Sequence, residues 1–222
     1  MKTCAKTRKI VPLVLALLLL FGGCSAVNRA AVFGTNGNET TRRQDVLTVE
    51  FLDVGQANAA LLTCGGKSLL IDGGNVADGA KVTRAVQAAT DRLDYVVNTH
   101  GHEDHIGAIP YVLKQVNMPI YCTRFTAGLI KLKLQEHRLL DSTKIITVEP
   151  GSTVRAGKFQ VEFIHVNHSI ADSVAFAIHT RMGTIVHTGD FKIDSTPIDG
   201  EVIDLARFGA LGHEGVLALL AD

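Results

Sequence analysis

Three histidines and an aspartate lie within six consecutive residues, from His100 to His105, in the order His-Gly-His-Glu-Asp-His. Neutral imidazole and carboxylate groups are donors that suit zinc or a similar divalent ion. A polar loop with incidental histidines is the alternative, but imidazoles are near neutral at pH 7 and have little other reason to crowd together. We therefore predict that this stretch, called the histidine loop below, binds metal.

The segments on either side place the histidine loop between a strand and a helix. Residues 93–99 form an apolar run typical of a buried strand, and residues 107–113 begin a helix with a proline in its first turn. Because side chains alternate along a strand, His100 and His102 should point the same way. The turn then brings Asp104 and His105 to a second, neighbouring position.

The wider sequence predicts alternating sheets and covering helices. Runs of apolar residues and turn signals favour a β-sandwich flanked by helices. The predicted strands are residues 47–54, 59–63, 67–71, 94–98, 145–148, 159–166, 173–179 and 184–187, and the predicted helices are residues 78–89, 108–115, 125–137 and 202–211.

The pattern His-x-His-x-Asp-His after an apolar strand resembles the signature of the metallo-β-lactamase fold superfamily. Further pieces follow in order: Asp72 ends an apolar strand before two glycines, His168 stands in Val-Asn-His-Ser, and Asp190 stands in His-Thr-Gly-Asp. The resemblance covers about residues 47–222. It implies an α/β fold, the four-layer αββα sandwich, in one domain of residues 46–222 that is incomplete at its C-terminus.

Two closer likenesses divide this region near the histidine loop. Residues 47–99, with Val-Glu-Phe-Leu-Asp-Val-Gly-Gln at their start, resemble the extracytoplasmic hydrolase domain of the competence protein ComEC family. From residue 100 onward the chain resembles the catalytic domain of the bacterial ribonuclease J family. In that family a β-CASP insertion that grips RNA follows the equivalent of residues 219–222, and a final histidine then returns to the second metal. The likeness implies a truncated domain whose second metal lacks one ligand.

The superfamily resemblance also implies a role for each site residue. His100, His102 and His168 would hold a first metal, Asp104 and His105 a second, and Asp190 would bridge the two. Two zinc ions, or manganese as the alternative, would share and activate a hydroxide.

Two aspartates receive further roles from the same resemblance. Asp104 is the catalytic candidate, because it could also orient the attacking water. Asp72 would lie behind the ligands and fix the loop and a histidine tautomer by hydrogen bonds; a turn-forming aspartate is the alternative. Aspartate rather than cysteine at the bridge favours phosphoesters over lactams. The remaining histidines, His165, His179 and His187 among them, are interpreted as structural or surface residues.

The N-terminus predicts export. Four basic residues precede an apolar run from Ile10 to Phe21, and no acidic residue appears before Glu39. This is typical of a secretory signal peptide, here residues 1–23. Two glycines before Cys24 resemble a bacterial lipoprotein cleavage site, so Cys24 would be lipidated and anchor the protein to a membrane surface. An ordinary signal peptide cut near Ala26 is the alternative.

The segment after the signal is predicted to be a flexible tether over residues 24–45, because it has few large apolar residues. Four of the 22 basic residues and no acidic residue lie in residues 1–23, so removal of that segment leaves 18 basic against 22 acidic residues, a formal charge of −4. An acidic domain gains no bulk electrostatic help in binding a phosphodiester backbone. Location outside the cytoplasm is expected, whereas ribonuclease J is cytoplasmic. A cytoplasmic protein is the alternative if the N-terminus arose by gene fusion.

Three functions fit these features. The first is a metal-dependent phosphodiesterase or ribonuclease-like enzyme that acts on nucleic acid or another phosphodiester. The second is an exported hydrolase of small molecules, including lactams. The third is a remnant that binds metal without turnover. Hydrolysis of a phosphodiester or of a lactam would separate the first two.

Overall fold

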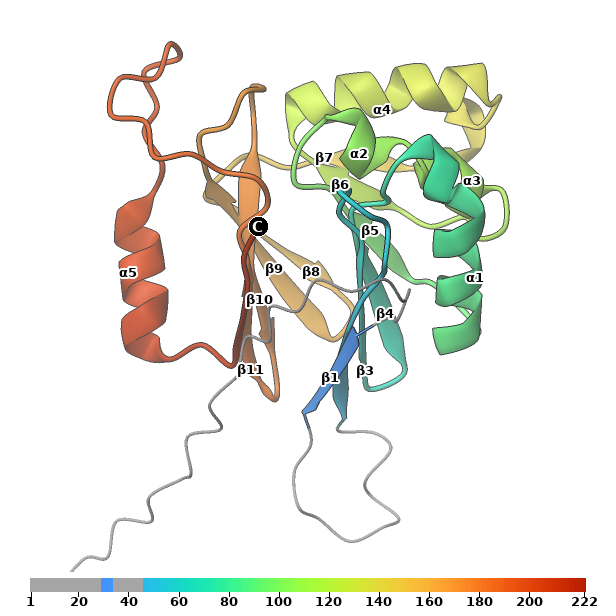
Figure 1. Ribbon diagram of the computed structural model, residues 1–222, viewed down its shortest axis with the longest axis horizontal. Coiled ribbons are helices and arrows are strands. Elements are labelled where there is room, and N and C mark those ends of the chain that lie inside the picture. Colours follow the sequence, from blue (N-terminus) through green and yellow to red (C-terminus); the bar gives the residue numbers. More distant parts are fainter. Residues whose placement is uncertain (1–28, 34–45) are drawn as a thin grey trace, which may run out of the picture.

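A computed structural model describes residues 29–33 and 46–222 of the chain. Two β-sheets pack face to face, and helices cover the outer face of each sheet (Figure 1). Helix α5 (Leu205–Glu214) covers one outer face of the sandwich. Helices α1 (Gly79–Ala89), α3 (Ile109–Leu113) and α4 (Arg124–Glu136) cover the other, so that four layers are stacked. The expected α/β class and αββα sandwich are confirmed.

Within the described residues, the first sheet has seven strands in chain order. Strands β1 to β4 are antiparallel, whereas β4 to β7 are parallel and need helical crossovers. The strands are β1 (Arg29–Phe33), β2 (Leu47–Phe51), β3 (Ala60–Cys64), β4 (Lys67–Ile71), β5 (Tyr95–Val97), β6 (Ile120–Cys122) and β7 (Ile145–Thr147). The helices in the crossovers are α1 (Gly79–Ala89), α2 (Glu103–Ile106), α3 (Ile109–Leu113) and α4 (Arg124–Glu136), with short 3-10 turns at Val76–Asp78 and Leu140–Ser142.

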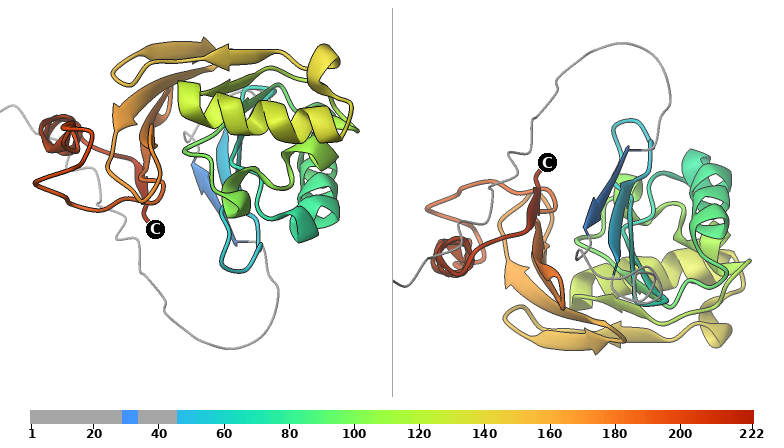
Figure 2. Two further views of the ribbon diagram at one scale, coloured as in Figure 1. Left: turned by 90° about the horizontal axis from the view of Figure 1, so that it is seen from above. Right: turned by 90° about the horizontal axis from the view of Figure 1, so that it is seen from below.

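The second sheet has five strands in the order β12-β11-β10-β9-β8. Its neighbouring strands are antiparallel except at one edge, where β12 runs parallel to β11. Its strands are β8 (Thr153–Ala156), β9 (Phe159–His165), β10 (Val174–Thr180), β11 (Gly183–His187) and β12 (Ala218–Leu220). Helix α5 (Leu205–Glu214) connects β11 to β12. Seen from above and from below, the two sheets are separate layers that face each other (Figure 2).

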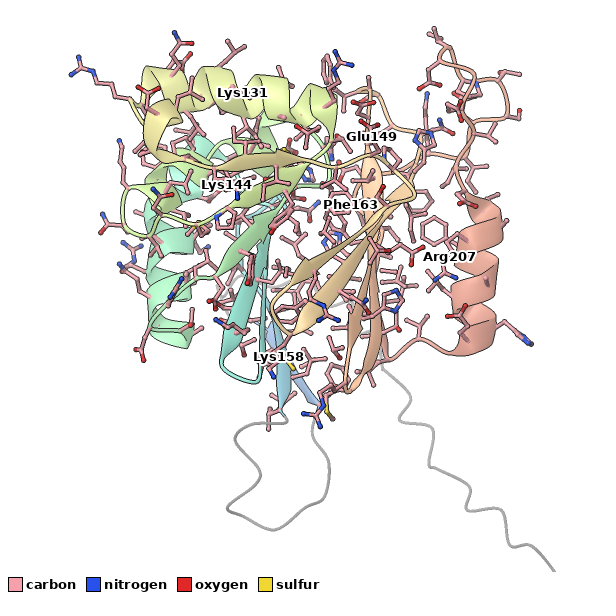
Figure 3. All side chains as sticks on the ribbon, turned by 180° about the vertical axis from the view of Figure 1, so that it is seen from behind. Lys131, Lys144, Glu149, Lys158, Phe163 and Arg207 are labelled. Carbon is pink, nitrogen blue, oxygen red and sulfur yellow. The ribbon has the colours of Figure 1, made fainter. Side chains whose placement is uncertain are left out.

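Strand alternation divides the core into three apolar layers. Leu61 and Leu70 face the helices of the first sheet, whereas their neighbours Leu62 and Leu69 point between the two sheets. The layer between the sheets includes the rings of Phe163 and Phe176, which meet edge to face with centroids 4.9 Å apart. Phe163 projects from β9 toward the first sheet (Figure 3). This buried layer fixes the spacing of the two sheets, and therefore of the loops at their ends.

Helix α5 is held to the second sheet by an ion-pair network as well as by apolar contacts. The Arg207 guanidinium donates to both carboxylate oxygens of Glu162 on β9, at 2.6 and 2.9 Å (Figure 3). His179 on β10 lies 3.1 Å from the same carboxylate. The Asp204 side chain accepts from the Arg207 backbone N–H and caps the helix. The helix predicted from residue 202 therefore begins at Leu205.

The predicted strands and helices are present, with ends shifted by a few residues, but four short strands escaped prediction: β1, β6, β8 and β12. Strand β1 corrects the expected tether, because Arg29–Phe33 pairs antiparallel with β2. Its small apolar residues can extend the ladder along the free edge of β2, and Phe33 packs against the layer between the sheets. Flexibility was the wrong expectation for these five residues.

Other N-terminal predictions lie outside the described residues. These are the signal peptide of residues 1–23, the anchor Cys24 and the rest of the tether, residues 24–28 and 34–45. Within residues 29–33 and 46–222, no helix combines the length and the apolar character needed to cross a bilayer.

Candidate metal centre

The predicted ligands come from both sheets and meet at one end of the sandwich. The histidine loop follows β5 of the first sheet, while His168 follows β9 and Asp190 follows β11 of the second. The two sides are joined by a hydrogen bond from the Val174 N–H to the Thr99 carbonyl, 3.0 Å long. Gly189 has φ +56°, and a Cβ there would lie 3.0 Å from both Thr99 and the Val174 carbonyl. Glycine therefore lets Asp190 approach the histidine loop closely.

One group of imidazoles corresponds to the first predicted metal position. The nitrogens of His100, His102 and His168 that face the group all lie within 4.8 Å of one another. The His100 and His102 nitrogens are 3.1 Å apart, and the His100 and His168 ring centroids are 4.8 Å apart. His100 is fully buried, while His168 remains partly exposed. Three imidazoles that converge in this way suit a zinc-type ion with a further position open to solvent.

A second group overlaps the first and contains His100, His105 and Asp190, again with one ligand atom each within 4.8 Å. The His105 Nε2 atom is buried and has no hydrogen-bond partner among the described residues. Its nearest charged neighbour across the two sheets is Asp190, whose Oδ1 atom lies 3.3 Å away at ion-pair distance. A buried nitrogen without a partner costs free energy. A bound metal would relieve this cost, so the donor set fits a divalent ion.

The two oxygens of Asp190 face different imidazoles. Its Oδ2 atom lies 3.9 Å from His100 Nε2 and 3.6 Å from His168 Nε2, whereas its Oδ1 atom faces His105. Asn58 donates its side-chain N–H to Oδ1 at 3.1 Å. A carboxylate with one oxygen toward each group has the geometry of a bridge between two metal positions.

Asp104 lies at the rim of the site. Its Oδ2 atom is 3.9 Å from His105 Nε2, and its side chain is 38% exposed. It does not belong to either of the two tight groups of donors. Asp104 can therefore reach an ion beside His105 or a water that enters from solvent.

Asp72 lies behind the candidate ligands and is completely buried. Its carboxylate accepts hydrogen bonds from the Thr99 hydroxyl at 2.6 Å, the Thr99 N–H at 2.9 Å and the Asn98 amide at 3.1 Å. His105 Nδ1 is 2.9 Å from the same carboxylate, which turns Nε2 toward the centre. Asp72 also has φ +55°, so it makes the turn before Gly73 as well.

The electrostatics of the site follow from burial and from this cluster of charges. Burial alone would lower the pKa of His105, but the Asp72 and Asp190 carboxylates raise it to about 10. Burial and the neighbouring charge of His105 lower the pKa of His100 to about 4. Burial opposes ionisation of Asp190, yet His105 and the other imidazoles lower its pKa to about 2. Without metal, His105 therefore holds a proton that an ion must displace.

The structure adds residues that the sequence did not reveal. Asn98 and Thr99 bind Asp72, and Asn58 binds Asp190, although no sequence pattern links Asn58 to a residue 132 positions away. His165 Nε2 lies 3.3 Å from the Glu201 carbonyl. His187 is buried, and its Nδ1 accepts the Gly189 N–H at 3.0 Å, which supports the turn that leads to Asp190.

Comparison with known proteins gives a family match and several relatives. Residues 52–215 match the family described as Metallo-beta-lactamase superfamily. Ribonuclease J of Synechocystis sp. is 52% identical over 134 residues, which make up 60% of this chain and 21% of that protein. Ribonuclease J of Helicobacter pylori strain 26695 is 47% identical over 133 residues, or 60% of this chain and 19% of that protein. The chain thus spans about a fifth of the length of these curated relatives.

Solved structures share the fold. The metallo-beta-lactamase fold protein YhfI from Bacillus subtilis has 28% identity and a TM-score of 0.50, and the match covers 63% of this chain and 56% of YhfI. A Cronobacter sakazakii metallo-beta-lactamase has a TM-score of 0.55 at 18% identity over 78% of this chain and 74% of that one. At that identity the likeness extends to the fold alone.

Proposed function

We propose, on the premise that this chain belongs to the metallo-β-lactamase superfamily, that the protein is a metal-dependent hydrolase that cleaves phosphodiester bonds in RNA. The observation that carries the proposal is the placement of Asp190, whose two oxygens face two different groups of imidazoles. A carboxylate in this position can hold two ions at a fixed separation, which is how many phosphodiesterases and nucleases are built.

In this proposal His100, His102 and His168 would hold one ion, His105 and Asp104 would hold the other, and Asp190 would bridge them. Zinc is proposed because imidazole nitrogens dominate the donor set, with manganese as the alternative. When bound, such ions activate a water at neutral pH and neutralise charge on the attacked phosphate.

Two aspartates, Asp72 and Asp104, would orient the groups that take part in this reaction. The buried Asp72 carboxylate fixes the His105 ring, so that Nε2 is always directed at the centre. Asp104 is partly exposed at the rim, where its carboxylate can orient the attacking water and accept a proton from it. We propose Asp104 as the catalytic residue for this reason.

RNA as substrate is supported by the relatives named Ribonuclease J, at 52% and 47% identity. The hard aspartate oxygen at the bridge agrees with a phosphoester substrate, since hard oxygen ligands favour ions that bind phosphate oxygens.

The test compares three substrates on the purified chain after removal of metal and after restoration with zinc or manganese. An RNA oligonucleotide and bis(p-nitrophenyl) phosphate should be hydrolysed only with metal, and nitrocefin should not be hydrolysed. Asp190→Asn should abolish hydrolysis, while Asp194→Asn in the same loop should not, because Asp194 is paired with Lys192. Cleavage of nitrocefin without cleavage of either phosphodiester would favour a lactam hydrolase. Metal binding without turnover on any substrate would favour the remnant.

We further propose that residues 1–23 are a lipoprotein-type signal and that Cys24 anchors the domain of residues 46–222 to a membrane surface outside the cytoplasm. Basic residues before an apolar run, and two glycines before Cys24, support this assignment. Labelled fatty acid should enter the expressed protein, and Cys24→Ser should prevent its incorporation. Label that persists in the serine variant would contradict the anchor. An unlabelled parent would also contradict it, and would leave an ordinary signal peptide cut near Ala26 or the cytoplasmic alternative.

A further inference from the structure

Asn58 lies in the turn between β2 and β3, where its backbone joins two segments that support the site. Its N–H donates to the Asp104 carbonyl of the histidine loop at 3.2 Å. Its carbonyl accepts the Gly74 N–H at 3.0 Å, in the segment that follows Asp72. These two bonds fix the position of the Asn58 backbone relative to the first sheet.

The Asn58 side chain crosses from the first sheet to the second. Its amide N–H donates to Asp190 Oδ1 at 3.1 Å, and Asp190 follows β11 of the second sheet. Asn58 is half-buried, and the Asp190 side chain is only 20% exposed, so the hydrogen bond is largely shielded from water. A shielded hydrogen bond to a charged carboxylate is stronger than one at the surface.

This bond selects one orientation of the carboxylate. Oδ1 is held by Asn58 beside His105, which leaves Oδ2 turned toward His100 and His168. Rotation of the carboxylate would break the Asn58 hydrogen bond and move both oxygens away from these positions. The Asn58 amide therefore aligns the Asp190 carboxylate as a bridging ligand before any ion binds.

We propose that Asn58 is a positioning residue that holds Asp190 in its bridging orientation and thereby sets the affinity of the ion beside His105. This inference rests on the proposed two-metal function. The ion beside His105 depends on Oδ1, the oxygen that Asn58 contacts, whereas the other ion is held mainly by His100, His102 and His168. Loss of the amide should therefore weaken one site and spare the other.

The experiment is a zinc titration of metal-free protein by calorimetry, for the parent, Asn58→Ala and Asn58→Leu. Both variants keep the backbone bonds to Asp104 and Gly74 but lack the side-chain donor, and leucine keeps the branching at Cγ that asparagine has. The control is Gln56→Ala, which removes an exposed amide side chain from the same turn. Absorption of cobalt(II) added in place of zinc reports the coordination of each ion separately.

We expect two zinc sites in the parent and in Gln56→Ala. In both Asn58 variants the weaker site should lose about 10-fold to 100-fold in affinity, the range for partners that orient metal ligands. The tighter site and the cobalt spectrum of the first equivalent should be unchanged. Two sites of parental affinity in both Asn58 variants would overturn the inference but leave the proposed function standing. A parent that binds no zinc would overturn both.

Discussion

Replacement of Asp72 with asparagine should change the number of protons that zinc displaces when it binds. In the metal-free protein the charge of Asp72 is the largest influence that raises the pKa of His105, which reaches about 10. At pH 8 the imidazole is therefore almost fully protonated. An imidazole with an ordinary pKa near 6.5 would be only a few per cent protonated at that pH. Zinc needs the free Nε2 lone pair, so its binding must release this proton.

Asp72→Asn should therefore release fewer protons than the parent at pH 8, by at most about one proton, because part of the His105 protonation depends on Asp72. Affinity itself is a poorer readout, because two effects oppose each other. Loss of Asp72 removes the group that orients the His105 ring, which weakens binding by about 10-fold to 100-fold. Loss of Asp72 also removes competition from the proton, which strengthens binding.

The assay is calorimetry of zinc binding in several buffers of different ionisation enthalpy, which gives the number of released protons directly. Asp94→Asn is the matched control, because it removes another buried carboxylate, one paired with Lys67 before β5. That variant should release as many protons as the parent. Equal proton release from Asp72→Asn and the parent would refute the role of Asp72 in holding His105 protonated.

Three further predictions concern the fold and the ligands. Phe163→Ala should lower the free energy of unfolding by about 3–5 kcal/mol, because a fully buried ring between the sheets is removed, as measured by urea denaturation. Glu162→Gln should cost about 1–2 kcal/mol at pH 7 through loss of the charged bonds to Arg207. Arg207 lowers the pKa of Glu162, although burial of the Glu162 carboxylate opposes this shift. The stability cost of Glu162→Gln should therefore persist above pH 4.5 and fade as the pH drops through the lowered pKa. Equal costs at pH 7 and pH 3 would contradict this prediction. His102→Ala should remove one bound ion, and unchanged metal content would show that the site is elsewhere.

The fold was largely predictable because most of its strands carry long apolar runs. Strand β9 and helix α4 follow the periods expected of a strand and a helix. Strands β6 and β12 have three residues each, too few for a period to be visible. Strand β1 depends on the edge that β2 offers, a contact that no local pattern encodes.

Part of the candidate site was predictable from the sequence and part was not. The four candidate ligands in the histidine loop were predictable because they are neighbours in sequence and all have side chains that bind divalent ions. His168 and Asp190 are isolated in sequence, so only resemblance to a family could suggest them. Asn58 escaped prediction because its partner is 132 residues away, across the seam between the two sheets. Long-range contacts of this kind are set by how the sheets pack, which local periodicity does not specify.

Anomalous diffraction from crystals of the zinc-loaded protein tests the central claim most directly, because it locates each ion without reference to activity. Two peaks are predicted, about 3.5–4 Å apart. The first should lie about 2.0–2.1 Å from nitrogens of His100, His102 and His168. The second should lie beside His105 Nε2, and each peak should contact one oxygen of Asp190. A single peak, or two peaks that leave Asp190 without a metal contact, would contradict the account.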